Sequence, residues 1–179
     1  LGKNTIDRIK QWVREGGTVI TLRNATSWAI RSKFVSEKFT EAEKQETPPR
    51  MDYVTARDFR GSKAIGGSMY AADVDTSHPL GFGYNSRDVS VYRNHSIFMA
   101  PSSNPFSTVV QYKENPLQAG YVNKENLLRI GGTASLIVSG IGRGNVIMFA
   151  DNPNFRGMWY GTNKLFFNAL FLGDKAGRR

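Results

Sequence analysis

The sequence contains no cysteine. A chain without cysteine can form no disulfide and no zinc–thiolate site, and it has no cysteine nucleophile. Its apolar runs are also short, so we expect no segment to span a membrane. The 179 residues, 40% of them hydrophobic, suffice for one globular domain with its own core. We therefore expect a single folded unit over residues 1–179 that needs no covalent or metal staple.

Histidine is almost as scarce, because His78 and His95 are the only two in the chain. A serine hydrolase needs a histidine beside an activated serine, but Ser102 and Ser103 lie in a loop-like stretch and no GxSxG elbow occurs. A zinc peptidase needs paired histidines near a glutamate, and neither histidine has a glutamate at such a spacing. We therefore assign no catalytic residue to this chain.

Asp73, Asp75 and His78, in the segment DVDTSH, have the ligand chemistry of a divalent-metal site. Their spacing matches no recognised metal motif, and an odd offset along a strand places side chains on opposite faces. A turn in which Asp and Ser side chains bond to the backbone is the favoured interpretation. No metal or cofactor is therefore expected in this chain.

The formal charge of +9 makes the surface basic, which attracts polyanions. A nucleic-acid-binding protein usually gathers its charge in a patch with exposed aromatic residues. Here Lys and Arg are spread from Lys3 to Arg179, and only the tail KAGRR forms a local cluster. The distribution argues against nucleic acid, which is kept only as a minor alternative function.

The first twenty-two residues predict a helix followed by a strand. Asn4 is the expected N-cap, the apolar residues that follow have helical spacing, and Gly16 and Gly17 end the helix. The run TVITL at 18–22 carries no charge, which is typical of a strand buried on both faces. Helix, double glycine and buried strand form half of a βαβ unit whose first strand is missing. We therefore expect the chain to be a fragment of a longer polypeptide.

Residues 31–67 are polar, and we expect a partly mobile excursion there with at most short helices. A loop and short helix at 24–30 precede it. Strands are predicted at 68–75, at 88–94 and 96–100 joined by a tight hairpin at Asn94 and His95, and at 107–113.

The C-terminal third gives the clearest pattern. One or two helical turns are expected within 123–132. Two apolar runs between 133 and 151 flank GIGRG, which fits a β-hairpin better than a phosphate-binding loop because a strand follows it. The last helix is expected to begin at the N-cap Thr162 and to be packed inside, because it is apolar nearly all round.

A polar group follows the strand VIMFA, where open α/β sheets often bind ligands. The favoured interpretation is structural: Asp and Asn shape the turn and the arginine pairs with a carboxylate. The alternative is a small-ligand or glycan-binding module in which two aromatic rings supply stacking surfaces. Its candidate residues are Asp151, Asn152, Asn154, Arg156, Trp159 and Tyr160.

Four segments together resemble the class I glutamine-amidotransferase-like domain fused C-terminally to large bacterial zinc carboxypeptidases of the carboxypeptidase A type. They are IKQWVREGGTVITL, DTSHPLGFGY, GIGRGNVIMFADNPNFRG and GTNKLFFNALFLG. The resemblance implies a flavodoxin-like three-layer α/β sandwich, truncated at its N-terminal side, with a C-terminal β-hairpin and closing helix.

Active members of this family use a cysteine on an elbow, with a histidine and an acidic partner. This chain has no cysteine, and neither histidine matches the catalytic one. The resemblance therefore implies a non-catalytic accessory domain that stabilises its parent or binds a partner or substrate. It also implies a periplasmic or extracellular zinc metallocarboxypeptidase as the parent. The upstream peptidase domain would be the partner and would hold the only zinc.

Overall fold

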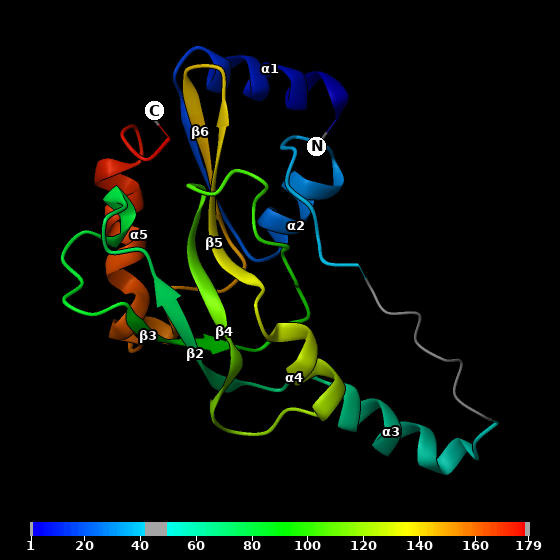
Figure 1. Ribbon diagram of the computed structural model, residues 1–179. Coiled ribbons are helices and arrows are strands. Elements are labelled where there is room, and N and C mark those ends of the chain that lie inside the picture. The colour runs from blue at the N-terminus through cyan, green and yellow to red at the C-terminus, as the bar shows by residue number, and fades with distance from the viewer. Residues whose placement is uncertain (1, 42–49, 178–179) are drawn as a thin grey trace.

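The computed structural model describes residues 2–41 and 50–177 and shows a mixed α/β fold (Figure 1). Within these residues one six-stranded sheet has the order β1-β6-β5-β4-β2-β3. Its strands are β1 (Thr18–Leu22), β2 (Ser68–Val74), β3 (Asp88–Arg93), β4 (Thr108–Ala119), β5 (Ala134–Ile141) and β6 (Gly144–Phe149). Only β1 and β6 run parallel, and the other neighbouring pairs are antiparallel. The α/β class expected from the sequence is confirmed, with a sheet that is mainly antiparallel.

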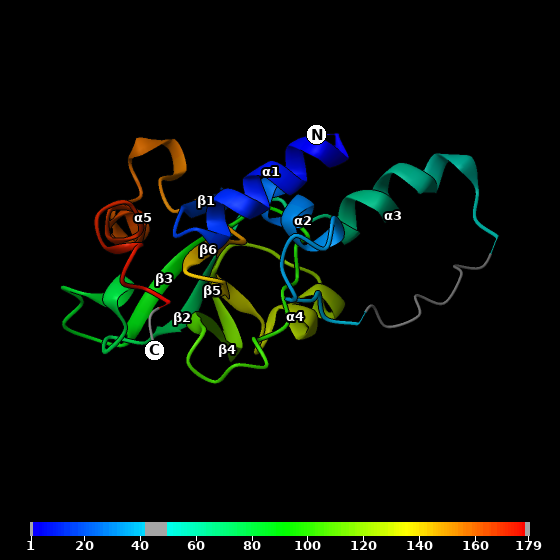
Figure 2. The same ribbon diagram turned by 90° about the horizontal axis from the view of Figure 1, so that it is seen from above.

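Helices cover both faces of this sheet (Figure 2). The helices are α1 (Lys3–Arg14), α2 (Asn24–Arg31), α3 (Ala56–Lys63), α4 (Lys124–Ile130) and α5 (Tyr160–Leu172). One core joins α1 and α2 to Val146 and Met148, whereas the other joins α5 to Ile147 and Phe149. Side chains alternate along a strand, so β6 feeds both cores and is buried along its whole length.

Strand β1 departs from the expectation of burial on both faces. It lies at the edge of the sheet, and of its five residues only Thr21 is buried. Its sole neighbour in the described part of the sheet is β6. The uncharged segment TVITL is therefore an edge strand that helices cover in part, and not a central strand of the sheet.

The predicted C-terminal hairpin is confirmed by the β5–β6 pair, in which Ile141 lies opposite Gly144. Gly142 has φ +61°, and a Cβ there would lie 2.8 Å from the carbonyl oxygen of Arg14 at the end of α1. The turn therefore needs glycine for its backbone conformation and for the close approach of α1.

The predicted 94–95 hairpin is wrong. Strand β3 pairs with β2, and the segment after His95 leaves the sheet, with Met99 forming isolated bridges to Phe39 and Ala134. Here the His95 side chain bonds to the buried carboxylate of Asp151 at 2.9 Å, and the chain that follows pairs with other segments instead of with β3.

Two predicted helix caps are also wrong. Helix α1 has Gly2 as its N-cap, so Asn4 lies inside the helix. Helix α5 has Trp159 as its N-cap, and the Thr162 hydroxyl instead donates to the carbonyl of Pro153 at 2.8 Å. This bond ties the helix to the turn before it.

Helix α5 is not packed inside, contrary to the expectation from its composition. Leu165 and Ala169 are buried against the sheet, but Leu170 and Phe171 are 54% and 79% exposed. Apolar residues all round the helix therefore leave one face uncovered in this structure.

The polar excursion 31–67 begins as part of the core, because Phe34 and Val35 are buried. Residues 42–49 lie outside the described residues, so the expected mobility stays a prediction. The helices within 50–67 are short, as expected. One of them, α3, projects from the body of the domain (Figures 1 and 2). Its last residue is held by the Asn126 side-chain amide, which donates to the Lys63 carbonyl at 2.7 Å.

In the part of the chain that the structure describes, the helices are too short or too polar to cross a membrane.

Candidate functional site

A strained turn joins β1 to α2 at Arg23. Its φ of 50° and ψ of −112° lie outside the left-handed helical region that non-glycine residues occasionally use. Such a conformation costs about 1–3 kcal/mol and persists only when its surroundings enforce it. Here the Arg23 amide donates to the carbonyl of Phe149 on β6 at 2.9 Å. A sharp strand-to-helix turn of this kind holds the nucleophile in α/β-hydrolases.

Beside this turn, the first residues after β6 include a buried carboxylate. Asp151 is 3% exposed and accepts three side-chain hydrogen bonds. The donors are His95 Nε2 at 2.9 Å, the Tyr112 hydroxyl at 2.7 Å and the Ser135 hydroxyl at 2.6 Å. These donors come from the loop after β3, from β4 and from β5, so one carboxylate links four parts of the sheet.

The counter-charge of Asp151 is Arg93, which is fully buried and has its Nη1 3.9 Å from the carboxylate. Its guanidinium also lies over the rings of Phe98 and Tyr112, at 4.9 and 5.3 Å from their centroids. One nitrogen donates to the carbonyl of Ile97, but Nε and Nη1 have no hydrogen-bond partner among the described residues. Arg93 therefore depends on the charge of Asp151 and on aromatic contacts.

His95 uses both ring nitrogens within this network. Its Nδ1 accepts from the Ile97 amide at 3.1 Å, so the neutral ring carries its proton on Nε2 and donates it to Asp151. Burial lowers the pKa of His95, and the bond to Asp151 opposes that shift only in part. Both nitrogens of His95 are therefore engaged within the network in this structure.

The same contacts set the ionisation of the other members. Burial opposes the charge on Asp151, but the bonds from His95 and Ser135 and the nearby Arg93 hold its pKa below the usual value. Burial, and then the negative charge of Asp151, raises the pKa of Tyr112 well above the usual value. The network is therefore an ionised carboxylate surrounded by protonated donors at neutral pH.

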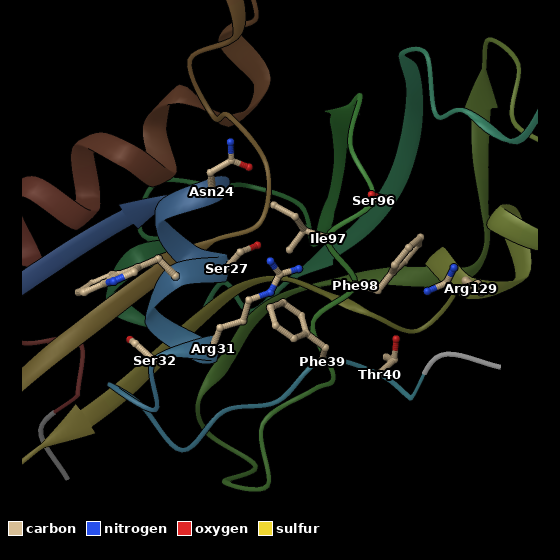
Figure 3. A pocket seen from close by; sticks show the side chains of 11 residues that line it. Asn24, Ser27, Arg31, Ser32, Phe39, Thr40, Ser96, Ile97, Phe98 and Arg129 are labelled. Atoms are coloured by element: carbon tan, nitrogen blue, oxygen red, sulfur yellow. The ribbon is translucent and has the colours of Figure 1, made fainter. Parts of the chain in front are cut away.

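A pocket of about 790 Å³ opens next to this network, at the carboxyl end of β1 (Figure 3). Such a volume suits a small-molecule ligand. Its apolar wall contains Trp28, Phe39, Ile97 and Phe98. Its polar lining comes from α2, from the segments around Thr40 and Ser96, and from α4: Asn24, Ser27, Arg31, Ser32, Thr40, Ser96 and Arg129.

The two arginines enter the pocket from different helices, Arg31 from α2 and Arg129 from α4 (Figure 3). Arg31 lies over the ring of Phe39, 5.8 Å from its centroid, and Arg129 lies over Phe98 at 4.1 Å. Neither forms an ion pair with a described carboxylate, and Arg129 Nε is buried without a hydrogen-bond partner there. The pocket is therefore basic.

The six strand-end candidates do not converge on either of the two pockets described here. Asp151 points into the buried network. Asn152 accepts from the Asn154 amide at 3.1 Å, which confirms a turn-shaping role for this asparagine. Trp159 Nε1 donates to the Ser90 carbonyl at 3.1 Å. The other two, Arg156 and Tyr160, are exposed.

The expected pairing of Arg156 with a carboxylate is not found among the described residues, where its guanidinium lies over the Phe155 ring at 5.3 Å. Whether the exposed members of this strand-end group bind a ligand stays a prediction.

A second pocket lies at the turn predicted within DVDTSH (73–78) and includes Asp73, Asp75 and His78 in its lining. Asp73 forms an ion pair with Arg87, and Asp75 accepts from the amide and hydroxyl of Ser77 at 2.9 and 2.6 Å. The turn-forming role of Asp75 is thereby confirmed. Among the described residues, no group of three or more His, Cys, Asp or Glu side chains could hold a metal ion.

Sequence reasoning missed most of this site. The sequence identifies Asp151 as a candidate but not the roles of His95, Arg93 and the pocket arginines, because these residues carry no local motif and Arg129 lies 106 residues after Arg23. One signal was available: a charged residue, Arg93, ends a strand whose alternate residues Val89 and Val91 are buried. Alternation alone predicts that Arg93 faces the core.

No protein-family model and no curated protein sequence matches this chain. Among solved structures, the chain is similar to the cytoplasmic protein STM3548 of Salmonella typhimurium, with a TM-score of 0.51 and 12% identity over 96% of this chain. It spans 61% of that protein. A cold-adapted β-galactosidase from Rahnella sp. R3 matches with a TM-score of 0.40 and 14% identity, over 98% of this chain and 21% of the enzyme.

At this level of identity the likeness to the Salmonella protein concerns the fold alone. It agrees with the mixed α/β class described above. The β-galactosidase match carries no weight here. Function must therefore be argued from the site.

Proposed function

We propose that this chain is a non-catalytic, amidotransferase-like accessory domain of a bacterial zinc carboxypeptidase, which stabilises its parent or binds a partner or substrate. The observation that carries the proposal is the turn at Arg23. It has the strained geometry of a strand-to-helix nucleophile elbow, yet an arginine occupies it and the chain has no cysteine. A guanidinium is always protonated and cannot serve as a nucleophile.

The histidine near this turn supports the same proposal. The Arg23 amide bonds to Phe149, two residues before the Asp151 that His95 contacts, so the turn and this histidine meet the same stretch of chain. His95 is neutral, 8% exposed in its side chain, and bonded at both nitrogens. A histidine and a carboxylate thus stand beside the elbow, but they support the fold instead of a reaction.

The finer fold belongs to the same proposal. Two apolar cores on opposite faces of the sheet support a three-layer α/β arrangement. The parallel pair of β1 and β6 supports a flavodoxin-like sheet, whereas the four antiparallel pairs depart from that parallel pattern.

The absence of amidotransferase chemistry is tested with the purified chain and L-glutamine. No ammonia release above the buffer rate is expected. The variant Arg23→Cys supplies a thiol at the elbow, but it should stay inactive because neither nitrogen of His95 is available as a base. Ammonia release that survives repurification and disappears in Arg23→Ala would contradict the proposal.

The parent is tested with the intact polypeptide. We expect stoichiometric zinc and chelator-sensitive release of C-terminal amino acids from peptides, with both lost on removal of the upstream domain. Deleting residues 1–179 should lower the melting temperature of the parent if this domain stabilises it. An intact polypeptide without a zinc peptidase domain would refute this part.

A further inference from the structure

The pocket between α2 and α4 combines two guanidinium groups with an aromatic wall (Figure 3). We propose that it binds a small organic carboxylate, with Arg31 and Arg129 holding the carboxylate and the aromatic wall covering an apolar body. The inference rests on the binding role proposed above and gives it a ligand class. Its test can fail without affecting the absence of amidotransferase chemistry.

Uncompensated positive charge is the first argument. Arg93 and Arg129 both lie over the ring of Phe98, at 4.9 and 4.1 Å from its centroid. Asp151 balances Arg93, but Arg129 has no carboxylate partner among the described residues. The charge of Arg129 is thus unbalanced in the described structure, and an anion beside it in the pocket is favoured because charges attract more strongly in a partly desolvated site than in water.

Arg31 adds a second cation without a described ion-pair partner, and no described acidic residue lines the pocket. The first turn of α2 adds positive potential at the same opening. Its N-cap, Arg23, makes no side-chain cap bond, and Asn24 in that turn lines the pocket. The free amide groups of a helix start favour a nearby anion, which here strengthens a site already defined by the arginines.

The geometry of Arg129 favours a carboxylate. Its Nε is buried without an acceptor in the described structure. An unmatched buried donor costs about 1–3 kcal/mol, and a planar two-oxygen acceptor can bind Nε and a terminal nitrogen together.

The pocket's size and wall favour a ligand with an apolar body over a bare anion. A volume of about 790 Å³ exceeds what inorganic phosphate or acetate would fill. Trp28, Phe39 and Phe98 would stay wet around such an ion. An aromatic or aliphatic carboxylate removes this apolar surface from water while its charged end meets the arginines.

The test is calorimetric titration of the full chain with phenylacetate, phenylacetamide and inorganic phosphate. Phenylacetamide has the shape of phenylacetate without the charge. We expect phenylacetate to bind about 10- to 100-fold more tightly than the amide, because hydrogen bonds to charged groups contribute about 1.5–3 kcal/mol. Phosphate should bind more weakly than phenylacetate. Quenching of Trp28 emission by phenylacetate gives an independent readout, since this ring lines the pocket.

The variants Arg129→Gln and Arg31→Gln should each weaken phenylacetate binding by about ten-fold or more. Arg57→Gln, which removes the same charge from an exposed position on α3, should leave it unchanged. Arg129→Lys keeps the charge but loses the planar, two-pronged donor of the guanidinium, so it should keep only part of the affinity. Because this change is conservative, it also serves as the test if Arg129→Gln does not fold.

The inference is overturned if phenylacetamide binds as tightly as phenylacetate, or if phenylacetate gives neither heat nor quenching. It is also overturned if the folded variants Arg31→Gln and Arg129→Gln both bind phenylacetate with unchanged affinity. Tighter binding of phosphate than of phenylacetate would refute the choice of a carboxylate.

Discussion

The substitution Asp151→Asn should remove most of the margin that keeps this domain folded. The change keeps the size of the side chain but deletes the charge that balances the fully buried Arg93. It also replaces an oxygen that accepts hydrogen bonds by an amide group. Breaking a buried ion pair from one side costs about 3–5 kcal/mol, because the remaining charge stays desolvated and uncompensated.

The structure supports a value in that range. Asp151 accepts three hydrogen bonds as an anion, and Arg93 has two nitrogens without other partners in the described residues. Individual bonds to a charged group contribute about 1.5–3 kcal/mol, but members of one network do not add. A domain of this size is stable by about 5–15 kcal/mol, so the loss is a large fraction of the total.

Urea unfolding followed by tryptophan emission measures the effect. The matched control is Asp88→Asn, whose side chain is 71% exposed and pairs with Lys113 on the surface. Such a pair contributes at most about 1 kcal/mol, so the control should change the free energy of unfolding little. A loss of less than about 1 kcal/mol in Asp151→Asn, with an unchanged m-value, would refute this prediction. It would mean that the charge of Arg93 is balanced by something other than Asp151.

Three further predictions concern pH, the β-turn and the last helix. The pKa values of His95 and Asp151 are both lower in the folded state, so the unfolded state binds more protons in acid. The free energy of unfolding should therefore change little between about pH 7 and 9, fall as the pH drops below about 6.5, and fall further below about 4. The raised pKa of Tyr112 adds a fall above about pH 10, where the unfolded state loses this proton first. Urea titrations across this range measure it, and a flat profile between pH 7 and 5 would contradict the His95 contribution. Gly142→Ala should lower the free energy of unfolding by about 1–3 kcal/mol, because of strain at φ +61° and contact with Arg14. The control Gly140→Ala has open space around its Cβ and should not lower it. Equal melting temperatures of the two variants would refute this prediction. Thr162→Val should lower the free energy of unfolding by about 1–3 kcal/mol, because it removes the hydrogen bond to the Pro153 carbonyl and keeps the side-chain volume. An unchanged urea midpoint would contradict this prediction and would mean that water replaces the bond.

The elements that sequence reasoning predicted well are those fixed by local chemistry. The hairpin of β5 and β6 follows from two apolar runs around a glycine turn. The helical turns expected within 123–132 form α4, which ends before Gly131. The strand expected at 68–75 is β2. The predictions for Asn4 and Thr162 failed because any of several neighbouring residues can start a helix, and the packing of the preceding turn decides which one does.

The candidate site was harder to predict because its members meet only in three dimensions. His95 and Asp151 are separated by 56 residues, and Tyr112 and Asp151 by 39. A histidine between two short apolar runs is equally compatible with a hairpin, and only the buried carboxylate excludes that structure. The pocket arginines lie on helices whose sequence suggests ordinary solvated cations, and their aromatic neighbours Phe39 and Phe98 come from other segments.

The position of β6 has a consequence for the order in which this chain can fold during synthesis. Strand β6 follows the other described strands in the chain, yet it is the only described neighbour of β1 in the sheet. The buried donors of His95, Tyr112 and Ser135 likewise precede their shared acceptor, Asp151, in the chain. Until β6 has been synthesised, β1 lacks this neighbour and Arg93 lacks the carboxylate that balances its charge. We therefore expect this part of the sheet to form late in folding, once β6 and the carboxylate that follows it are both available.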